Sequence, residues 1–209
     1  MILARRPFCS LQTIGLLVCM LLAWLAVGGA VQAQAEAARA PSVRSAAVAA
    51  DDLRVELRDL LPQNRLVGKS RFSVWGFDVY DARLWADPDF QPGRMANQTF
   101  ALELAYLRDF NSLDIAQRSI SEMGRSASIA EAQANQWIQD MRRVIPDIKK
   151  GDRVMGIHRP GVGALFLVNG KTSGEIPDAE FARLFFGIWL SPRTSEPKLR
   201  QALLAGAGG

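Results

Sequence analysis

The segment over residues 151–190 constrains the fold more than any other, because strand, turn and helix signals follow one another there without a break. Alternation over residues 153–157 predicts one strand, and the apolar run over residues 164–168 predicts the next. After that run stands Asn169-Gly170, a dipeptide typical of type I′ hairpin turns, and a third strand is expected beyond it. The segment therefore predicts a β-meander of antiparallel strands.

A buried helix is expected directly after the meander. Asp178 stands in the position of an N-cap, and apolar residues then recur at the helical spacing i, i+3, i+4, i+7. These residues are Phe181, Leu184, Phe185 and Ile188, and Ala182, Phe186 and Trp189 widen the face. So wide a face indicates burial on most sides, and we expect the helix to lie across the meander. Strands followed by a helix favour an α+β fold over alternating parallel βαβ units.

The first 33 residues have the pattern of a secretory signal peptide. Arg5 and Arg6 precede an apolar run over residues 16–27, and Val31-Gln32-Ala33 offers a small-residue cleavage site. The run is shorter than the roughly 20 apolar residues that a membrane-spanning helix needs. We therefore expect cleavage, with an uncleaved membrane anchor as the alternative, and export to the bacterial periplasm.

Cleavage leaves 176 of the 209 residues, which is enough for one domain with a sizeable core. Both cysteines, Cys9 and Cys19, lie in the signal segment, so the mature chain has neither a disulfide nor a thiolate metal site. Its 23 basic residues against 21 acidic ones give a net charge of +2, and no nucleic-acid partner is expected. Residues 34–50 are rich in alanine and predict a disordered linker, which puts the domain at residues 51–209.

Aromatic and β-branched residues predict a second hairpin over residues 71–74 and 77–85, with Gly76 at its turn or bulge. The alternating segment over residues 100–106 predicts one more strand.

Three further helices are expected. One begins near Ser112 or Asp114, either of which suits an N-cap, and another begins at Ser128, which forms a capping box with Glu131. A short helix is expected over residues 198–204. The summed prediction is one α+β domain in which an antiparallel sheet carries its helices on one side.

His158 is the only histidine, so the chain cannot assemble a histidine-based metal site. It is expected to be an exposed loop residue beside Arg159 and not a catalytic group. The glycine-containing segments 68–71 and 161–163 do not lie between a strand and a helix, as a phosphate-binding loop requires. We expect neither a metal nor a cofactor.

Arg71 opens an otherwise apolar, aromatic strand. A guanidinium in that position either extends to solvent or points into a cavity, where it can hold an anionic group. Tyr80, Trp85 and Tyr106 have amphipathic side chains that could line the same cavity, with the hydrophobic core as the alternative location. These four residues are the candidate ligand-binding residues.

Five segments are notable for their order and spacing. They are Gly68-x-Ser70-Arg71-Phe72, Val79-Tyr80-Asp81-Ala82-Arg83-Leu84-Trp85, Phe100-Ala101-Leu102-Glu103-Leu104-x-Tyr106, Pro146-Asp147-x-x-x-Gly151-Asp152 and Phe181-Ala182-x-x-Phe185-Phe186-Gly187-Ile188-Trp189-Leu190. Together they resemble the bacterial chalcone isomerase-like family, over nearly all of residues 53–204.

The resemblance implies an open-faced β-sandwich, in which helices pack on one face of a long antiparallel sheet and leave a cleft between the two layers. In plant chalcone isomerases that cleft cyclises a chalcone to a flavanone. In the related plastid fatty-acid-binding members it holds an acyl chain, with an arginine on the carboxylate. Arg71 matches the position of that arginine, so the resemblance implies that Arg71 holds an anionic head group.

The catalytic groups of the plant enzymes do not carry over. Tyr80 stands in the strand where those enzymes have a threonine that helps to hold a catalytic water. No tyrosine follows Tyr106, so the family's catalytic tyrosine is missing, and residues 178–190 contain no threonine.

Three hypotheses follow for function. The first is a non-catalytic binder of a hydrophobic, fatty-acid-like molecule with an anionic head group. The second is an isomerase of the intramolecular lyase type, and the third is a structural or partner-binding envelope protein. A monomer is expected, with the membrane involved only through the signal segment before cleavage.

Overall fold

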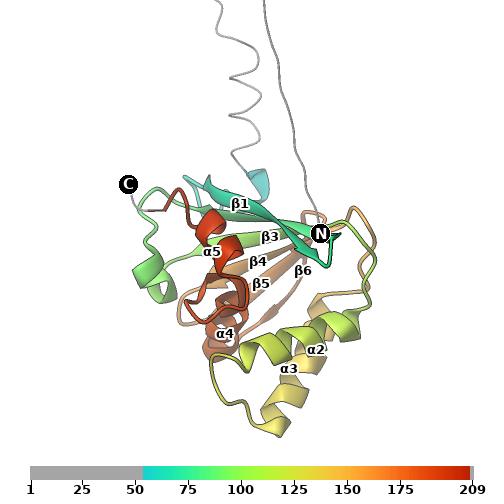
Figure 1. Cartoon of the computed structure of the whole chain (residues 1–209). Helices are drawn as coiled ribbons and strands as arrows, with labels where there is room; N and C mark the ends of the chain where they lie inside the picture. Colours follow the sequence, from blue (N-terminus) through green and yellow to red (C-terminus); the bar gives the residue numbers. More distant parts are fainter. Residues whose placement is uncertain (1–53, 208–209) are drawn as a thin grey trace, which may run out of the picture. The chain divides into compact units, whose positions relative to one another are not determined.

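Six strands form one antiparallel sheet in which each strand pairs with the next along the chain (Figure 1). The computed structural model describes residues 54–207, so the predicted signal peptide (1–33) and linker (34–50) lie outside the described residues. The strands are β1 (Arg65–Val74), β2 (Phe77–Ala86), β3 (Phe100–Tyr106), β4 (Arg153–Arg159), β5 (Gly163–Val168) and β6 (Lys171–Ile176). The helices are η1 (Val55–Leu57), η2 (Pro92–Asn97), α2 (Ser112–Met123), α3 (Glu131–Val144), α4 (Ala179–Leu190) and α5 (Pro197–Leu203).

The α-helices gather on one face of the sheet, as Figure 1 shows. Helix α4 packs on β4 and β5, α5 packs on β1 and β2, and α3 lies against β6. Helix α2 packs on α3 and α4. The predicted α+β class, with an open antiparallel sheet and helices on one face, is confirmed.

The predicted meander and its helix are also present. Asn169 and Gly170 have φ angles of 51° and 80°, the positive values that a type I′ turn requires. Asp178 caps α4 by accepting a hydrogen bond of 2.9 Å from the backbone N–H of Phe181. The same carboxylate accepts a 2.9 Å hydrogen bond from Nε1 of Trp137, so one residue both starts α4 and joins it to α3.

One helix begins at Ser112, as predicted, but two predicted helix caps are wrong. Asn111, not Ser112 or Asp114, caps α2, because its side-chain oxygen accepts the N–H of Asp114 at 2.8 Å. Ser112 is inside the helix and donates its hydroxyl to the carbonyl of Ile145. Helix α3 begins at Glu131 without a side-chain cap, so the capping box predicted at Ser128 does not form.

The two faces of the sheet carry different cores. The helix face holds the main apolar cluster, whose large aromatic members are almost completely buried: Phe100, Phe166, Phe181 and Phe186. The opposite face, called the open face here, carries a smaller cluster made of Leu57, Leu61, Trp85, Ala101, Met155, Ile157 and Leu167. Among the residues that the structure describes, only the short segment around η1 supplies its cover from outside the sheet.

Within residues 54–207, no helix combines the length and the apolar character needed to cross a bilayer.

Candidate functional site

The structure separates the four predicted site residues into two pairs. Tyr80 and Tyr106 pack with the main core on the helix face. Trp85 belongs to the smaller cluster on the open face, and Arg71 is paired there with Asp81. The structure therefore does not bring Arg71 and Trp85 together with Tyr80 and Tyr106.

Arg71 has two carboxylate partners. Its guanidinium donates to both oxygens of Asp81, at 2.7 and 3.0 Å, and to Asp78 at 2.9 Å. The hydrogen bond to Asp81 and the charges of both aspartates raise the pKa of Arg71 above its usual value, and the same hydrogen bond lowers the pKa of Asp81. A ligand carboxylate on Arg71 must therefore compete with two carboxylates already in contact.

A surface hollow of about 310 Å³ lies beside Arg71. It is lined by Lys69, Ser70, Arg71, Asp81, Ala82 and Arg83. Three cationic residues against one carboxylate make this hollow a possible place for a small anion, but its lining contains no large apolar side chain. It does not by itself suit a hydrophobic tail.

On the helix face, four aromatic side chains form a continuous row. Phe72 stacks on Tyr80 with ring centres 5.1 Å apart, and Tyr80 meets the edge of Tyr106 at 6.0 Å. Phe110, in the loop after β3, follows at 5.6 Å from Tyr106. We call these residues the aromatic row. Sequence analysis predicted Tyr80 and Tyr106 but missed Phe72 and Phe110, although the alternation of β1 already separates Phe72 from Arg71.

The aromatic row carries two phenol hydroxyls in an apolar setting. Nε1 of Trp189, from α4, donates a 3.0 Å hydrogen bond to the hydroxyl oxygen of Tyr80. Burial raises the pKa of Tyr80 and also that of Tyr106. Both phenols are therefore protonated at neutral pH, so each can donate a hydrogen bond.

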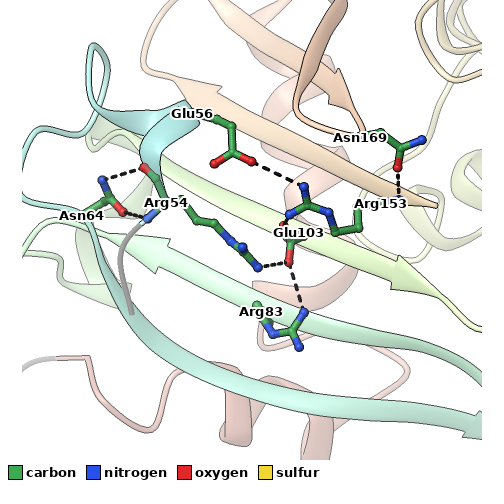
Figure 2. Close-up of polar contacts among 7 residues, drawn as sticks. All are labelled: Arg54, Glu56, Asn64, Arg83, Glu103, Arg153 and Asn169. Atoms are coloured by element: carbon green, nitrogen blue, oxygen red, sulfur yellow. Dashed lines mark hydrogen bonds and ion pairs between the residues drawn. The ribbon is translucent and has the colours of Figure 1, made fainter. Parts of the chain in front are cut away.

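The open face contains a buried carboxylate surrounded by arginines (Figure 2). Glu103, in the middle of β3, has a side chain only 1% exposed and accepts hydrogen bonds from Arg54 at 2.8 Å, Arg83 at 3.2 Å and Arg153 at 3.0 Å. Arg153 also pairs with Glu56 at 3.5 Å. We call these five residues the Glu103 cluster. Its three positive and two negative charges leave one excess positive charge.

Two side-chain amides and the ring of Trp85 hold the outer arginines of the Glu103 cluster in place. Asn64 accepts the backbone N–H of Arg54 at 2.8 Å, and Asn169 accepts that of Arg153 at 2.9 Å. The guanidinium of Arg54 also lies over the ring of Trp85, 5.0 Å from its centre. The cluster therefore ties the segment around η1 to the sheet, and Trp85 is part of that junction.

His158 lies in β4 and is buried, so the prediction of an exposed loop residue is wrong. The strand continues through Arg159, and the imidazole packs against the rings of Phe100 and Phe186, which also contact each other. The carbonyl of Gln98 lies 2.9 Å from Nδ1, and burial lowers the pKa of His158. The neutral ring therefore has its proton on Nδ1, which donates to Gln98.

Among residues 54–207, no three His, Cys, Asp or Glu side chains gather as a metal site would require.

The comparisons with known proteins agree with this architecture. The sequence profile of the chalcone isomerase-like family matches residues 65–205. The chain belongs to this family. The family predicted from the sequence segments is thereby confirmed.

This chalcone isomerase-like chain is 26% identical over 139 residues to an uncharacterized protein of Haemophilus influenzae, a match that covers 66% of each chain. The chain therefore spans just under two thirds of that relative. Among solved structures, it matches the fatty-acid binding protein AtFAP1 of Arabidopsis thaliana with a TM-score of 0.53. That match covers 68% of this chain and 87% of AtFAP1 at 14% identity, so it shows a common fold.

Proposed function

We propose that this chalcone isomerase-like protein is a non-catalytic binder of a hydrophobic small molecule with an anionic head group. The observation that carries the proposal is the aromatic row, an apolar wall that includes two protonated phenols, one partly buried and one buried. The similarity to a protein described as fatty-acid binding supports the same class of ligand.

The apolar part of the ligand is proposed to lie against the aromatic row, between the sheet and α2. The side chains proposed to contact the ligand come from the sheet, the loop after β3 and α2, and they are only partly buried, so they still have apolar surface to cover: Phe72, Tyr80, Phe110, Ile115 and Ile120. Deeper in the helix face the space is filled, since Phe166, Phe181 and Phe186 are at most 2% exposed. The ligand therefore occupies the rim of this layer and not its centre.

The head group is proposed to accept hydrogen bonds from Tyr80 and Tyr106. Tyr80 receives a hydrogen bond from Trp189, which leaves its own O–H for another acceptor. Arg71, the head-group residue implied by the family resemblance, faces the other side of the sheet and is held by Asp78 and Asp81. A head group bound by the two tyrosines and a head group bound by Arg71 therefore predict opposite effects on ligand binding when these residues are substituted.

The test is native mass spectrometry of the protein purified from its own host, followed by identification of any small molecule released on denaturation. Each lost phenol hydroxyl should reduce retained ligand by about fivefold, since a neutral hydrogen bond contributes about 1 kcal/mol. We therefore expect Tyr80→Phe and Tyr106→Phe to retain less of a small apolar acid, with their folds intact. Arg71→Ala is the matched control and should retain as much as the parent.

Two results would contradict this proposal. Loss of ligand from Arg71→Ala, with both tyrosine variants unchanged, would move the site to the hollow on the open face. Cyclisation of a chalcone by the parent protein, above the rate in solution, would make the protein an isomerase.

A further inference from the structure

The turn between β1 and β2 carries the most exposed large apolar side chain of the described residues. Trp75 is 94% exposed, and its neighbours Phe77 and Val74 are 61% and 38% exposed. The pairing of β2 with β3 begins only at Tyr80, so the turn extends beyond the end of β3. We call Val74, Trp75, Gly76 and Phe77 the aromatic tip.

The backbone of the aromatic tip does not explain its tryptophan. Trp75 and Gly76 have φ angles of 51° and 83°, so both central residues of the turn have the positive φ of a type I′ turn. A bulky side chain is a rare and strained choice at such a position, where asparagine, aspartate and glycine are usual. Asn169-Gly170 makes the same turn in the same sheet with the favoured residues.

Folding also gains little from Trp75, because its side chain remains in water. A large aromatic side chain contributes to stability by burial, and Trp75 has almost none. A strained backbone together with a side chain that buries nothing within residues 54–207 indicates a role outside folding.

One cationic side chain contacts the aromatic tip directly, and a second lies at the same end of the sheet. The guanidinium of Arg108 lies over the ring of Phe77, 5.2 Å from its centre. Lys149 lies at the same end of the sheet, since the nearby Gly151 donates its N–H to the carbonyl of Tyr106. The neighbouring carboxylates are already paired: Asp78 shares Arg71 with Asp81, and Asp109 pairs with Lys149.

We propose that the aromatic tip is a membrane-docking element, which inserts Trp75 and Phe77 into the interface of a lipid bilayer. Tryptophan favours the headgroup level of a bilayer, and the guanidinium of Arg108 beside Phe77 can reach a lipid phosphate. A convex tip of four residues offers far less than the roughly 800 Å² per partner of a standard protein interface. A bilayer accepts such a projecting tip without a complementary surface.

This inference is independent of the proposed ligand. It also differs from the sequence expectation that only the signal segment meets the membrane. Alternation and composition do not identify Trp75 as a projecting residue, because a tryptophan beside a strand is usually buried.

The test uses the protein as its host produces it, mixed with vesicles of phosphatidylcholine with and without phosphatidylglycerol. One readout is sedimentation with the vesicles, and the other is quenching of tryptophan fluorescence by brominated lipid chains. We expect Trp75→Asn to lower vesicle affinity by about tenfold or more, the effect of withdrawing one large aromatic side chain from an apolar phase. The quenching that comes from Trp75 should be lost from this variant. If the signal segment is retained, its Trp24 is quenched equally in both proteins, and the difference in quenching between parent and variant then reports Trp75.

Trp75→Asn separates docking from folding, because asparagine suits the turn. Its midpoint of unfolding in urea should equal or exceed that of the parent. The matched control is Val162→Asn, which removes another exposed apolar side chain at the opposite end of the sheet and should leave vesicle affinity unchanged.

Three results would overturn the proposal. They are a parent protein whose fluorescence the brominated lipids do not quench, a Trp75→Asn variant quenched as strongly as the parent, and an equal loss of affinity in Val162→Asn. If the tip instead binds a protein partner, Trp75→Asn would weaken that complex while the parent shows no vesicle binding.

Discussion

The two faces of this sheet are built from alternate residues of the same strands, yet they are stabilised by different forces. In β3, Leu102 and Leu104 enter the aromatic core under the helices, while Glu103 between them points to the open face. All three are buried. The two faces therefore do not differ in how deeply these residues are buried. They differ in the groups that cover them.

On the helix face, whole helices supply the cover, and the buried surface is apolar. On the open face, Glu103 is covered by the side chains of Arg54, Arg83 and Arg153, which also pair with its charge. A sheet face with few covering elements can thus bury a carboxylate by using long cationic side chains as both cover and counter-ions. Substitutions on the two faces should consequently lower the free energy of unfolding for different physical reasons.

The largest effect is expected on the helix face from Phe186→Ala. The ring of Phe186 contacts Phe100, His158 and Phe185, and it fills the space over Gly156. Removing it leaves a cavity, and we expect a loss of about 3–5 kcal/mol in the free energy of unfolding, measured in urea.

Phe77→Ala is the control for that substitution, because the same ring is removed from an exposed position and should cost no more than about 0.5 kcal/mol. A loss below about 1 kcal/mol in Phe186→Ala would show that the helix face can repack, and that its aromatic side chains are not close-packed.

The second effect is expected on the open face from Glu103→Gln. The substitution keeps the shape of the side chain but leaves three guanidinium groups facing a neutral amide. Breaking a buried ion pair costs about 3–5 kcal/mol, and we expect the lower end of that range because the arginines are partly exposed.

The matched comparison is Asp81→Asn, which removes a carboxylate from the half-exposed pair with Arg71 and should cost at most about 1 kcal/mol. Equal losses in Glu103→Gln and Asp81→Asn would mean that burial adds nothing to the ion pairs of the Glu103 cluster.

The difference between the faces was only partly predictable from the sequence. Alternation in β3 and the apolar spacing of α4 were sufficient to predict the strand, the helix and the packing of the helix across the sheet. The turn at Asn169-Gly170 was predictable because few other residues suit positive φ angles at both positions. These are local signals, and each one acts within a few residues.

The Glu103 cluster was not predictable, because its arginines come from residues 49, 20 and 50 positions away in the chain. Which long side chains meet across a sheet depends on strand register, and no local pattern reports it. The grouping of Tyr80 with Trp85 could have been avoided, since residues five apart in one strand point to opposite faces. The face of the sheet to which Arg71 points could not be predicted without the register of the β1–β2 hairpin, which includes a bulge between Phe72 and Ser73.

The smallest effect concerns pH and should separate the two faces by the range in which each responds. Burial lowers the pKa of His158 in the folded protein, so the unfolded chain takes up a proton first as the pH falls. Stability should therefore decrease as the pH drops below about 6.5, by at most about 1.4 kcal/mol per pH unit, and level off below the folded pKa.

On the open face the order of protonation is the same, but the pH range is lower. Arg71 lowers the pKa of Asp81, so that pair stabilises the fold above about pH 4 and its contribution disappears only in stronger acid. Urea unfolding from pH 7.5 down to about pH 3 should show the first decrease in the parent but not in His158→Gln, which retains a donor for the Gln98 carbonyl. Asp81→Asn should keep the first decrease and reduce the second. If His158→Gln shows the same first decrease as the parent, that loss of stability comes from other groups. His158 on the helix face would then contribute nothing to the response near neutral pH.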